Sequence, residues 1–259
     1  MGIVNVTPDS FSDGGLFLEA GAAVEHGLAL AEEGAAILDV GGESTRPGAS
    51  PVSEEDELRR VLPVVEGLSA AGRRVSIDTT KLAVARAALS RGATIVNDIS
   101  AFRFEPGLAG LVADRGAHCC LMHMLGDPRT MQQDPRYEDV VSEVKAFLEE
   151  RLAFAVGEGV SEERVWLDPG IGFGKTAAHN LELLRRLGEI AAIGRPVVVG
   201  TSRKSFLGKL AGGKPEAERL PGTIATNVLA FERGASIFRV HDVAPVVDAL
   251  AVAAATVTE

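Results

Sequence analysis

The feature that most constrains this chain is a unit that occurs eight times: a short run rich in Val and Ile, a turn, and an amphipathic stretch. The apolar runs are Gly2–Thr7, Ala36–Gly41, Val75–Thr79, Thr94–Ile99, His118–His123, Val165–Asp168, Val197–Thr201 and Ile237–His241. Because the runs are apolar almost throughout instead of alternating, they are typical of parallel strands covered on both faces.

The amphipathic stretches between the runs have helical spacing, and several end in Gly, as helix C-termini often do. The expected helices include Ala20–Glu33, Glu54–Ala71, Lys81–Arg91, Tyr137–Gly157 and Ala178–Leu187. Eight strand–helix units without a linker predict one α/β domain over residues 1–259, a single (β/α)8 TIM barrel. A doubly wound open sheet is the alternative, but it usually has fewer strands and a phosphate fingerprint after the first. The barrel floor is then closed by side chains alone, or by a short segment that precedes Met1 in the natural protein.

Composition excludes several classes of protein. Hydrophobic residues make up 46% of the chain and charged residues 24%, the balance of a globular protein. The net charge of −10 and the aromatic content of 5% argue against a nucleic-acid partner, which needs a basic face. The longest uncharged stretch, Leu220–Phe231, is too short to span a bilayer, so no membrane partner is expected.

The start of the chain and its cysteines indicate a compartment. No secretion signal is visible, and position 6 is Val6 instead of the Ser or Thr that myristoylation requires. Cys119 and Cys120 are adjacent, so they point to opposite faces of a strand and form no disulfide framework. We therefore expect a cytoplasmic protein whose partners are small molecules.

Each apolar run has a polar side chain at or near its C-terminal edge. These are Asn5, Asp39, Asp78, Asn97, His123, Asp168, Ser202 with Lys204, and Arg239 with His241. Polar residues often follow strands simply because loops are polar. However, a carboxylate inside an apolar run is costly without a partner, and the pattern holds for every run. In a barrel these ends meet at the C-terminal mouth of the strands, which is where we predict the active site.

Arg239 and His241 are two residues apart, so on a strand they point to one face. A guanidinium beside an imidazole can bind a pyrophosphate. The alternative is a structural ion pair of Arg239 with Asp242 or another neighbouring carboxylate.

Three loops carry unusual residues. The loops at 7–15 and 41–48 are rich in Gly, Pro and hydroxyl groups, and we interpret them as lids because each has one residue, Phe11 or Arg46, that suits a plain turn poorly. Solvated turns are the alternative. The third loop, 170–176, is not a Walker A motif, because Pro169 stands where its first Gly is required. Its Phe173 is a ligand candidate, whereas Met122 suits core packing as well.

Eight segments together resemble the dihydropteroate synthase family. They are 1–14, 39–48, 76–79, 96–99, 121–124, 168–174, 200–205 and 239–242. The resemblance covers essentially the whole chain and implies a (β/α)8 pterin-binding barrel. It also implies a transferase of folate biosynthesis, which joins 4-aminobenzoate to 6-hydroxymethyl-7,8-dihydropterin diphosphate and releases pyrophosphate. One departure is Phe238, where an aliphatic residue is commoner, and it concerns packing instead of chemistry.

The resemblance also implies roles for single residues. Asp168 accepts the two N–H groups of the pterin edge, Asn97 and Asp78 reach the other ring nitrogens, and Lys204 donates to the pterin. Arg239 lies on the ring face, and Lys204, Arg239, His241 and Asp78 are the expected catalytic residues. The diphosphate lies against Asn5, Thr45, Arg239 and His241 with Mg²⁺, for which Asn5 is the protein ligand. The remaining expected substrate contacts are Phe173, Met122, Ser205, Arg46, Pro47 and Phe11.

The resemblance further implies a sulfonamide target and a homodimer formed through late helices. Other interpretations remain open. A methyltetrahydrofolate-binding methyltransferase would lack both loop motifs, and a non-catalytic pterin-binding paralogue would have a damaged second loop or phosphate site. An unrelated phosphate-binding barrel would leave Asp78, Asn97 and Asp168 unexplained.

Overall fold

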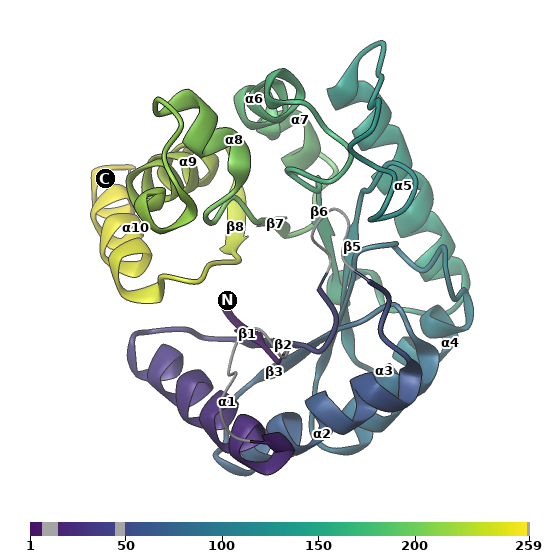
Figure 1. Cartoon of the computed structure of the whole chain (residues 1–259). Coiled ribbons are helices and arrows are strands. Elements are labelled where there is room, and N and C mark those ends of the chain that lie inside the picture. Colours follow the sequence, from purple (N-terminus) through teal and green to yellow (C-terminus); the bar gives the residue numbers. More distant parts are fainter. Residues whose placement is uncertain (7–14, 45–49, 258–259) are drawn as a thin grey trace.

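The computed structural model describes residues 1–6, 15–44 and 50–257. Eight parallel strands form one sheet in sequence order, and the sheet curls with helices around its outer side (Figure 1). The strands are β1 (Gly2–Asn5), β2 (Leu38–Gly41), β3 (Val75–Asp78), β4 (Ile95–Asp98), β5 (His118–Met122), β6 (Val165–Asp168), β7 (Val197–Val199) and β8 (Ala235–Phe238). The predicted α/β architecture of eight parallel strands is confirmed.

The described helices follow the strands and differ in length. The α-helices are α1 (Gly15–Glu32), α2 (Glu54–Ala70), α3 (Leu82–Ser90), α4 (Gly107–Arg115), α5 (Val140–Gly157), α6 (Ala177–Arg185), α7 (Leu187–Ala191), α8 (Ser205–Leu210), α9 (Leu220–Glu232) and α10 (Val243–Val257), and the 3-10 helices are η1 (Glu162–Arg164) and η2 (Glu216–Glu218). Side-chain caps set several starts: Ser53 accepts from the Asp56 N–H and Asp139 from the Val141 N–H. The cap at Asp139 explains why α5 begins three residues after the expected Tyr137.

The eighth strand differs from the expected run Ile237–His241, because it begins at Ala235 and ends at Phe238. The register between β7 and β8 shifts by one residue, pairing Val197 with Ala235 but Val198 with Ile237. After Phe238 the backbone still pairs: the Arg239 N–H donates to Val199 O, and Val240 forms a parallel bridge with Gly2 at the start of β1. The hydrophobic pattern did not include Ala235 and Ser236 in the expected strand, because a strand is defined by backbone pairing and not by side-chain polarity.

The two faces of the sheet carry separate apolar clusters. The larger one joins the strands to the surrounding helices and includes Cys119, whereas the smaller one contains Ile37, Ile95, Cys120, Trp166 and Val198. The adjacent cysteines therefore face opposite sides, as predicted, and both are buried and free. Among residues 1–6, 15–44 and 50–257, no helix is both long and apolar enough to cross a membrane.

Candidate active site

The carboxyl end of the sheet brings together five of the predicted polar residues, and hydrogen bonds join four of them directly. The Arg239 Nε donates to Asp39 Oδ2 at 2.6 Å, and its Nη2 donates to Asp78 Oδ2 at 2.7 Å. The Asn97 Nδ2 donates to the same Asp39 oxygen at 3.1 Å. Asp168 ends β6 and is buried, and its charge acts on Arg239. The carboxyl ends of β2, β3, β4, β6 and β8 thus supply one polar cluster.

Asp39 was expected only as a polar strand end and not as a site residue. It is 0% exposed, and one of its oxygens holds both Arg239 and Asn97. Its other oxygen, Oδ1, is buried without a hydrogen-bond partner among the described residues. The sequence signal was a carboxylate between Leu38 and Val40, inside an apolar run.

The cluster changes the proton affinity of its members. Burial raises the pKa of Asp168 to about 6, although the Gly170 N–H at 2.7 Å and the cations Lys204 and Arg239 act in the opposite direction. Burial also raises the pKa of Asp78, against the attraction of Arg239. For Arg239 burial alone would lower the pKa, but the carboxylates Asp39 and Asp78 raise it above its ordinary value. Arg239 therefore keeps its positive charge in this buried cluster.

Lys204 and Phe173 lie together beside this cluster. The Lys204 Nζ is 4.2 Å from the centroid of the Phe173 ring, and Lys204 precedes α8, which begins at the exposed Ser205. Phe173 packs on an apolar cluster formed by Ile99, Met122, Met124 and Met131. Met122 is buried in that cluster, so its packing role is visible in the structure.

Two contacts that were not expected hold the turn before Lys204. Arg203 has a left-handed backbone, with φ of +57°, and its guanidinium forms two hydrogen bonds to Asp242. The Ser202 Oγ lies 2.9 Å from His241 Nδ1 and accepts from the His241 backbone N–H at 3.1 Å. Of the alternative for Arg239, the pairing with Asp242 is wrong, because Asp242 pairs with Arg203. Its other part, an ion pair with another carboxylate, is found: Arg239 pairs with both Asp39 and Asp78.

The remaining expected residues fall in three groups. Phe11, Thr45, Arg46 and Pro47 lie outside the described residues. Asn5 ends β1 with an exposed side chain. His123, one of the polar strand ends, is absent from the polar cluster, because it contacts Lys175 and packs edge-on against Phe147.

The described residues offer few ligands for Mg²⁺. No group of three or more His, Cys, Asp or Glu side chains suited to a metal occurs in the described part of the chain. Asn5 offers one amide oxygen, an acceptable ligand for a hard cation that keeps several waters and binds substrate phosphates. The residues therefore fit Mg²⁺ only as an ion held mainly by water and substrate.

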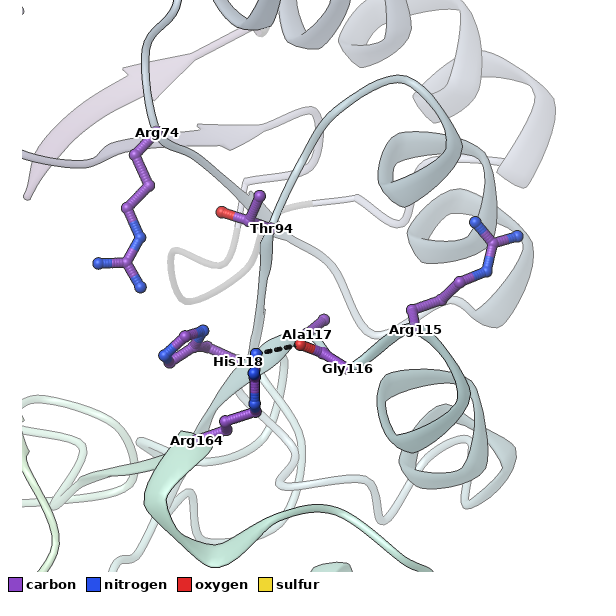
Figure 2. Close-up of a pocket in the computed structure, with 7 residues that line it drawn as sticks. All are labelled: Arg74, Thr94, Arg115, Gly116, Ala117, His118 and Arg164. Atoms are coloured by element: carbon purple, nitrogen blue, oxygen red, sulfur yellow. Dashed lines mark hydrogen bonds between the residues drawn. The ribbon is translucent and has the colours of Figure 1, made fainter.

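A hollow of about 420 Å³ lies at the amino ends of the strands (Figure 2). Arg74 precedes β3, His118 begins β5 and Arg164 precedes β6, so the hollow is at the opposite end of the sheet from Asp168 and Arg239. The Arg74 guanidinium lies 5.5 Å from the centroid of the Trp166 ring. None of the predicted site residues lines this hollow.

Comparison with known proteins defines the class of this chain. A family model described as pterin binding enzyme matches residues 1–241. The chain belongs to the pterin binding enzyme family.

The relatives within that class are dihydropteroate synthases. The Escherichia coli (strain K12) dihydropteroate synthase is 48% identical over 259 residues, which are 100% of this chain and 91% of the relative. The Xanthomonas albilineans dihydropteroate synthase with 4-aminobenzoic acid has 50% identity and a TM-score of 0.93, covering 100% of this chain and 93% of that one. The enzyme of the same organism in complex with 7,8-dihydropteroate has 46% identity and a TM-score of 0.89. The match covers 100% of this chain and 94% of that one. The resemblance predicted from the motifs is confirmed.

Proposed function

We propose that this chain condenses 6-hydroxymethyl-7,8-dihydropterin diphosphate with 4-aminobenzoate, giving 7,8-dihydropteroate and pyrophosphate for folate biosynthesis. The observation that carries this proposal is the joint placement of Asp39, Asp78, Asn97 and Arg239 by direct hydrogen bonds, beside Asp168. Acceptors and a cation at one strand end suit a flat heterocycle with several N–H groups and an anionic leaving group.

Asp168 is the proposed acceptor for the pterin edge that carries two N–H donors. One of its oxygens already accepts from the Gly170 N–H, which fixes the plane of the carboxylate. The Asn97 amide donates to Asp39, so its oxygen is left to accept from a ring N–H. Asp78 is the proposed partner of the remaining ring nitrogen, and the Lys204 ammonium donates to the pterin oxygen and ring nitrogen.

Arg239 and His241 are proposed to receive the leaving diphosphate. Two guanidinium nitrogens of Arg239 are engaged by Asp39 and Asp78, while its Nη1 makes no hydrogen bond to a described residue. Ser202 contacts His241 at Nδ1, so Nε2 is the nitrogen directed elsewhere. When bound, Mg²⁺ would neutralise charge on the diphosphate, and Asn5 would be its protein ligand. Thr45, which lies outside the described residues, would contact the phosphates.

The chemistry is a substitution at the pterin CH₂ group. The C–O bond to the diphosphate breaks, a C–N bond to the arylamine forms, and the amine loses a proton. The electron-rich ring can share positive charge at that carbon, so the site must stabilise the leaving group and exclude water. The arylamine is neutral at pH 7, so no strong general base is required. The second substrate is placed against Phe173, Lys204 and Ser205, with Phe11, Arg46 and Pro47 of the undescribed loops.

We further infer a single domain over residues 1–259 whose sheet closes into a (β/α)8 barrel with this site at its C-terminal mouth. The bridge between Gly2 and Val240 supports closure, because it links the first strand to the residues after the last. A cytoplasmic homodimer through the late helices is also proposed. It is supported by exposed apolar side chains on α9 and α10, namely Leu229, Val247 and Val252.

Pyrophosphate release from the pterin diphosphate, measured with and without 4-aminobenzoate, tests this function. We expect release that depends on 4-aminobenzoate and on Mg²⁺. Tight pterin binding without any release would instead indicate the non-catalytic paralogue. Methyl transfer from methyltetrahydrofolate would indicate the methyltransferase. Phosphate binding without pterin binding would indicate an unrelated phosphate-binding barrel.

A further inference from the structure

Lys175 is a buried lysine that the proposed reaction does not use. Its side chain is 3% exposed, and no carboxylate of the described residues lies within ion-pair distance of it. Its Nζ lies 2.8 Å from His123 Nδ1, 3.0 Å from Phe173 O and 3.5 Å from His123 O. These three neutral acceptors surround the amino group, which has two N–H donors when neutral and three when charged. Burial lowers the pKa of Lys175 to about 7, against the attraction of Asp168. A buried amino group with this arrangement costs free energy unless it organises its neighbours.

His123 is built to accept from Lys175. Burial, Lys175 and Arg103 lower its pKa to about 2, so the ring is neutral and Nδ1 can accept while Nε2 carries the proton. The ring is held edge-on by Phe147, with centroids 4.8 Å apart. His123 directly follows β5, whereas Lys175 lies in the loop between β6 and α6. The contact thus joins the end of β5 to the loop that follows the neighbouring strand β6.

The loop between β6 and Lys175 lies in tight contact with the segment after β5. A Cβ at Gly170 would lie 1.8 Å from His123 O, and one at Gly174 would lie 2.6 Å from Leu125 Cβ. Both glycines also have positive φ, +66° and +64°, which side chains rarely adopt. The Tyr137 hydroxyl donates to Gly174 O at 2.8 Å. The backbone of this loop is therefore set by its contacts with the β5 end, which include the hydrogen bond between Lys175 and His123.

We propose that Lys175, held by His123, is a positioning residue that fixes the Phe173 carbonyl and thereby directs the Phe173 ring onto Lys204 to form the 4-aminobenzoate subsite. This inference rests on the proposed function. The Asp168 carboxylate is oriented by a different donor, the neighbouring Gly170 N–H, although the charge of Lys175 also acts on it. The effect of Lys175 should consequently fall mainly on the second substrate.

Steady-state kinetics of Lys175→Met test the proposal, because Met keeps the length and removes the donors. We expect the KM for 4-aminobenzoate to rise about tenfold or more while the pterin Kd from calorimetry changes less than about twofold. Lys145→Met, at a half-buried lysine of α5 that pairs with Glu149, is the control and should change neither constant. His123→Gln keeps an acceptor and should stay near wild type, whereas His123→Leu should behave like Lys175→Met. If Lys175→Met does not fold, the comparison of His123→Gln with His123→Leu tests the proposal instead.

Amide hydrogen exchange at Phe173 provides a readout that needs no catalysis. Its N–H donates to Gly170 O at 3.0 Å, and we expect faster exchange in Lys175→Met than in wild type and in Lys145→Met. A lowered Tm with both ligand constants and the Phe173 exchange unchanged would show a merely structural lysine and overturn the proposal. Equal losses for pterin and 4-aminobenzoate would overturn it too. An inactive wild type is a failure of the proposed function instead, and Phe173 exchange then still tests the positioning.

Discussion

At the scale of the residue, Asp39 sets the direction of two other side chains. Its Oδ2 accepts from Arg239 and from Asn97, so it fixes the guanidinium and decides that the Asn97 amide presents oxygen to the site. The Asp39 side chain is fully buried, and these two bonds are the interactions that offset its desolvation.

Replacing Asp168 by Ala should abolish pterin binding and leave the fold intact. The side chain is buried at the end of β6 and its proposed partner is a ligand edge with two donors, so its loss should cost roughly 2–4 kcal/mol of binding free energy. Titration calorimetry with the pterin checks this, with circular dichroism as the control for folding. A pterin affinity near that of wild type would remove Asp168 from the proposed site.

Pterin affinity should also depend on pH through Asp168, whose pKa burial raises to about 6. Pterin binding requires the ionised carboxylate, so affinity should fall up to about tenfold per pH unit below 6 and level off above it. The stability contribution of Asp168 has the opposite sign: because its folded pKa lies above the unfolded one, that contribution is present at low pH and lost as pH rises through about 6. Calorimetry and urea unfolding between pH 5 and 8 measure both. Asp168→Asn should remove the parts of both dependences that are centred near pH 6. A slope near pH 7 that survives in this variant would belong to Asp78, whose pKa burial raises to about 7. An unchanged slope near pH 6 would assign it to another group.

At the scale of the element, the loop after β4 contains two residues with unfavourable backbone. Ala101 and Phe102 have φ of +52° and +63°, and the buried Asp98 accepts from Ser100 N, Ser100 Oγ and Phe102 N. Arg151 and Arg103 add hydrogen bonds to carbonyls in and beside this loop. The carboxylate therefore holds a strained turn that directly follows Asn97 of the site.

Asp98→Ala should destabilise the protein strongly, by about 2–4 kcal/mol, because it leaves two buried N–H groups and a strained turn without their acceptor. Asp127→Ala is a matched control, since Asp127 makes the same kind of turn with the N–H groups of Arg129 and Thr130 but at an exposed site. Chemical denaturation of both variants gives the comparison. Equal costs would mean that burial of Asp98 is unimportant.

At the scale of the whole molecule, the described surface has apolar side chains on its last two helices. Leu229 of α9 is 41% exposed and Val252 of α10 is 67% exposed, and the two helices pack against each other. Sedimentation should give a mass near twice 27.1 kDa, and Val252→Arg should shift the protein toward the monomer. Val156→Arg, at an exposed apolar residue of α5, is the control and should remain dimeric. A wild-type monomer at all concentrations would remove the proposed dimer.

The sequence predicted much of the architecture correctly. Seven of the eight expected runs overlap their strands closely, and the eighth is displaced toward Ala235. Apolar runs and helical spacing are local signals, and they are strong here because every strand is covered on both faces. The pattern of polar residues at the strand ends likewise predicted that Asp78, Asn97, Asp168 and Arg239 belong to one end of the sheet.

The sequence by itself determined the order of strands and helices, the family motifs and the polar residue types at the strand ends. Only the tertiary structure decided which of these residues touch: Arg239 meets Asp39 across 200 positions and Asp78 across 161, whereas His123 turns to Lys175. The physical reason is that side-chain partners depend on strand register and on the path of each loop. Long-range packing sets both, as the register shift between Val197 and Val198 and the glycine contacts at His123 O illustrate.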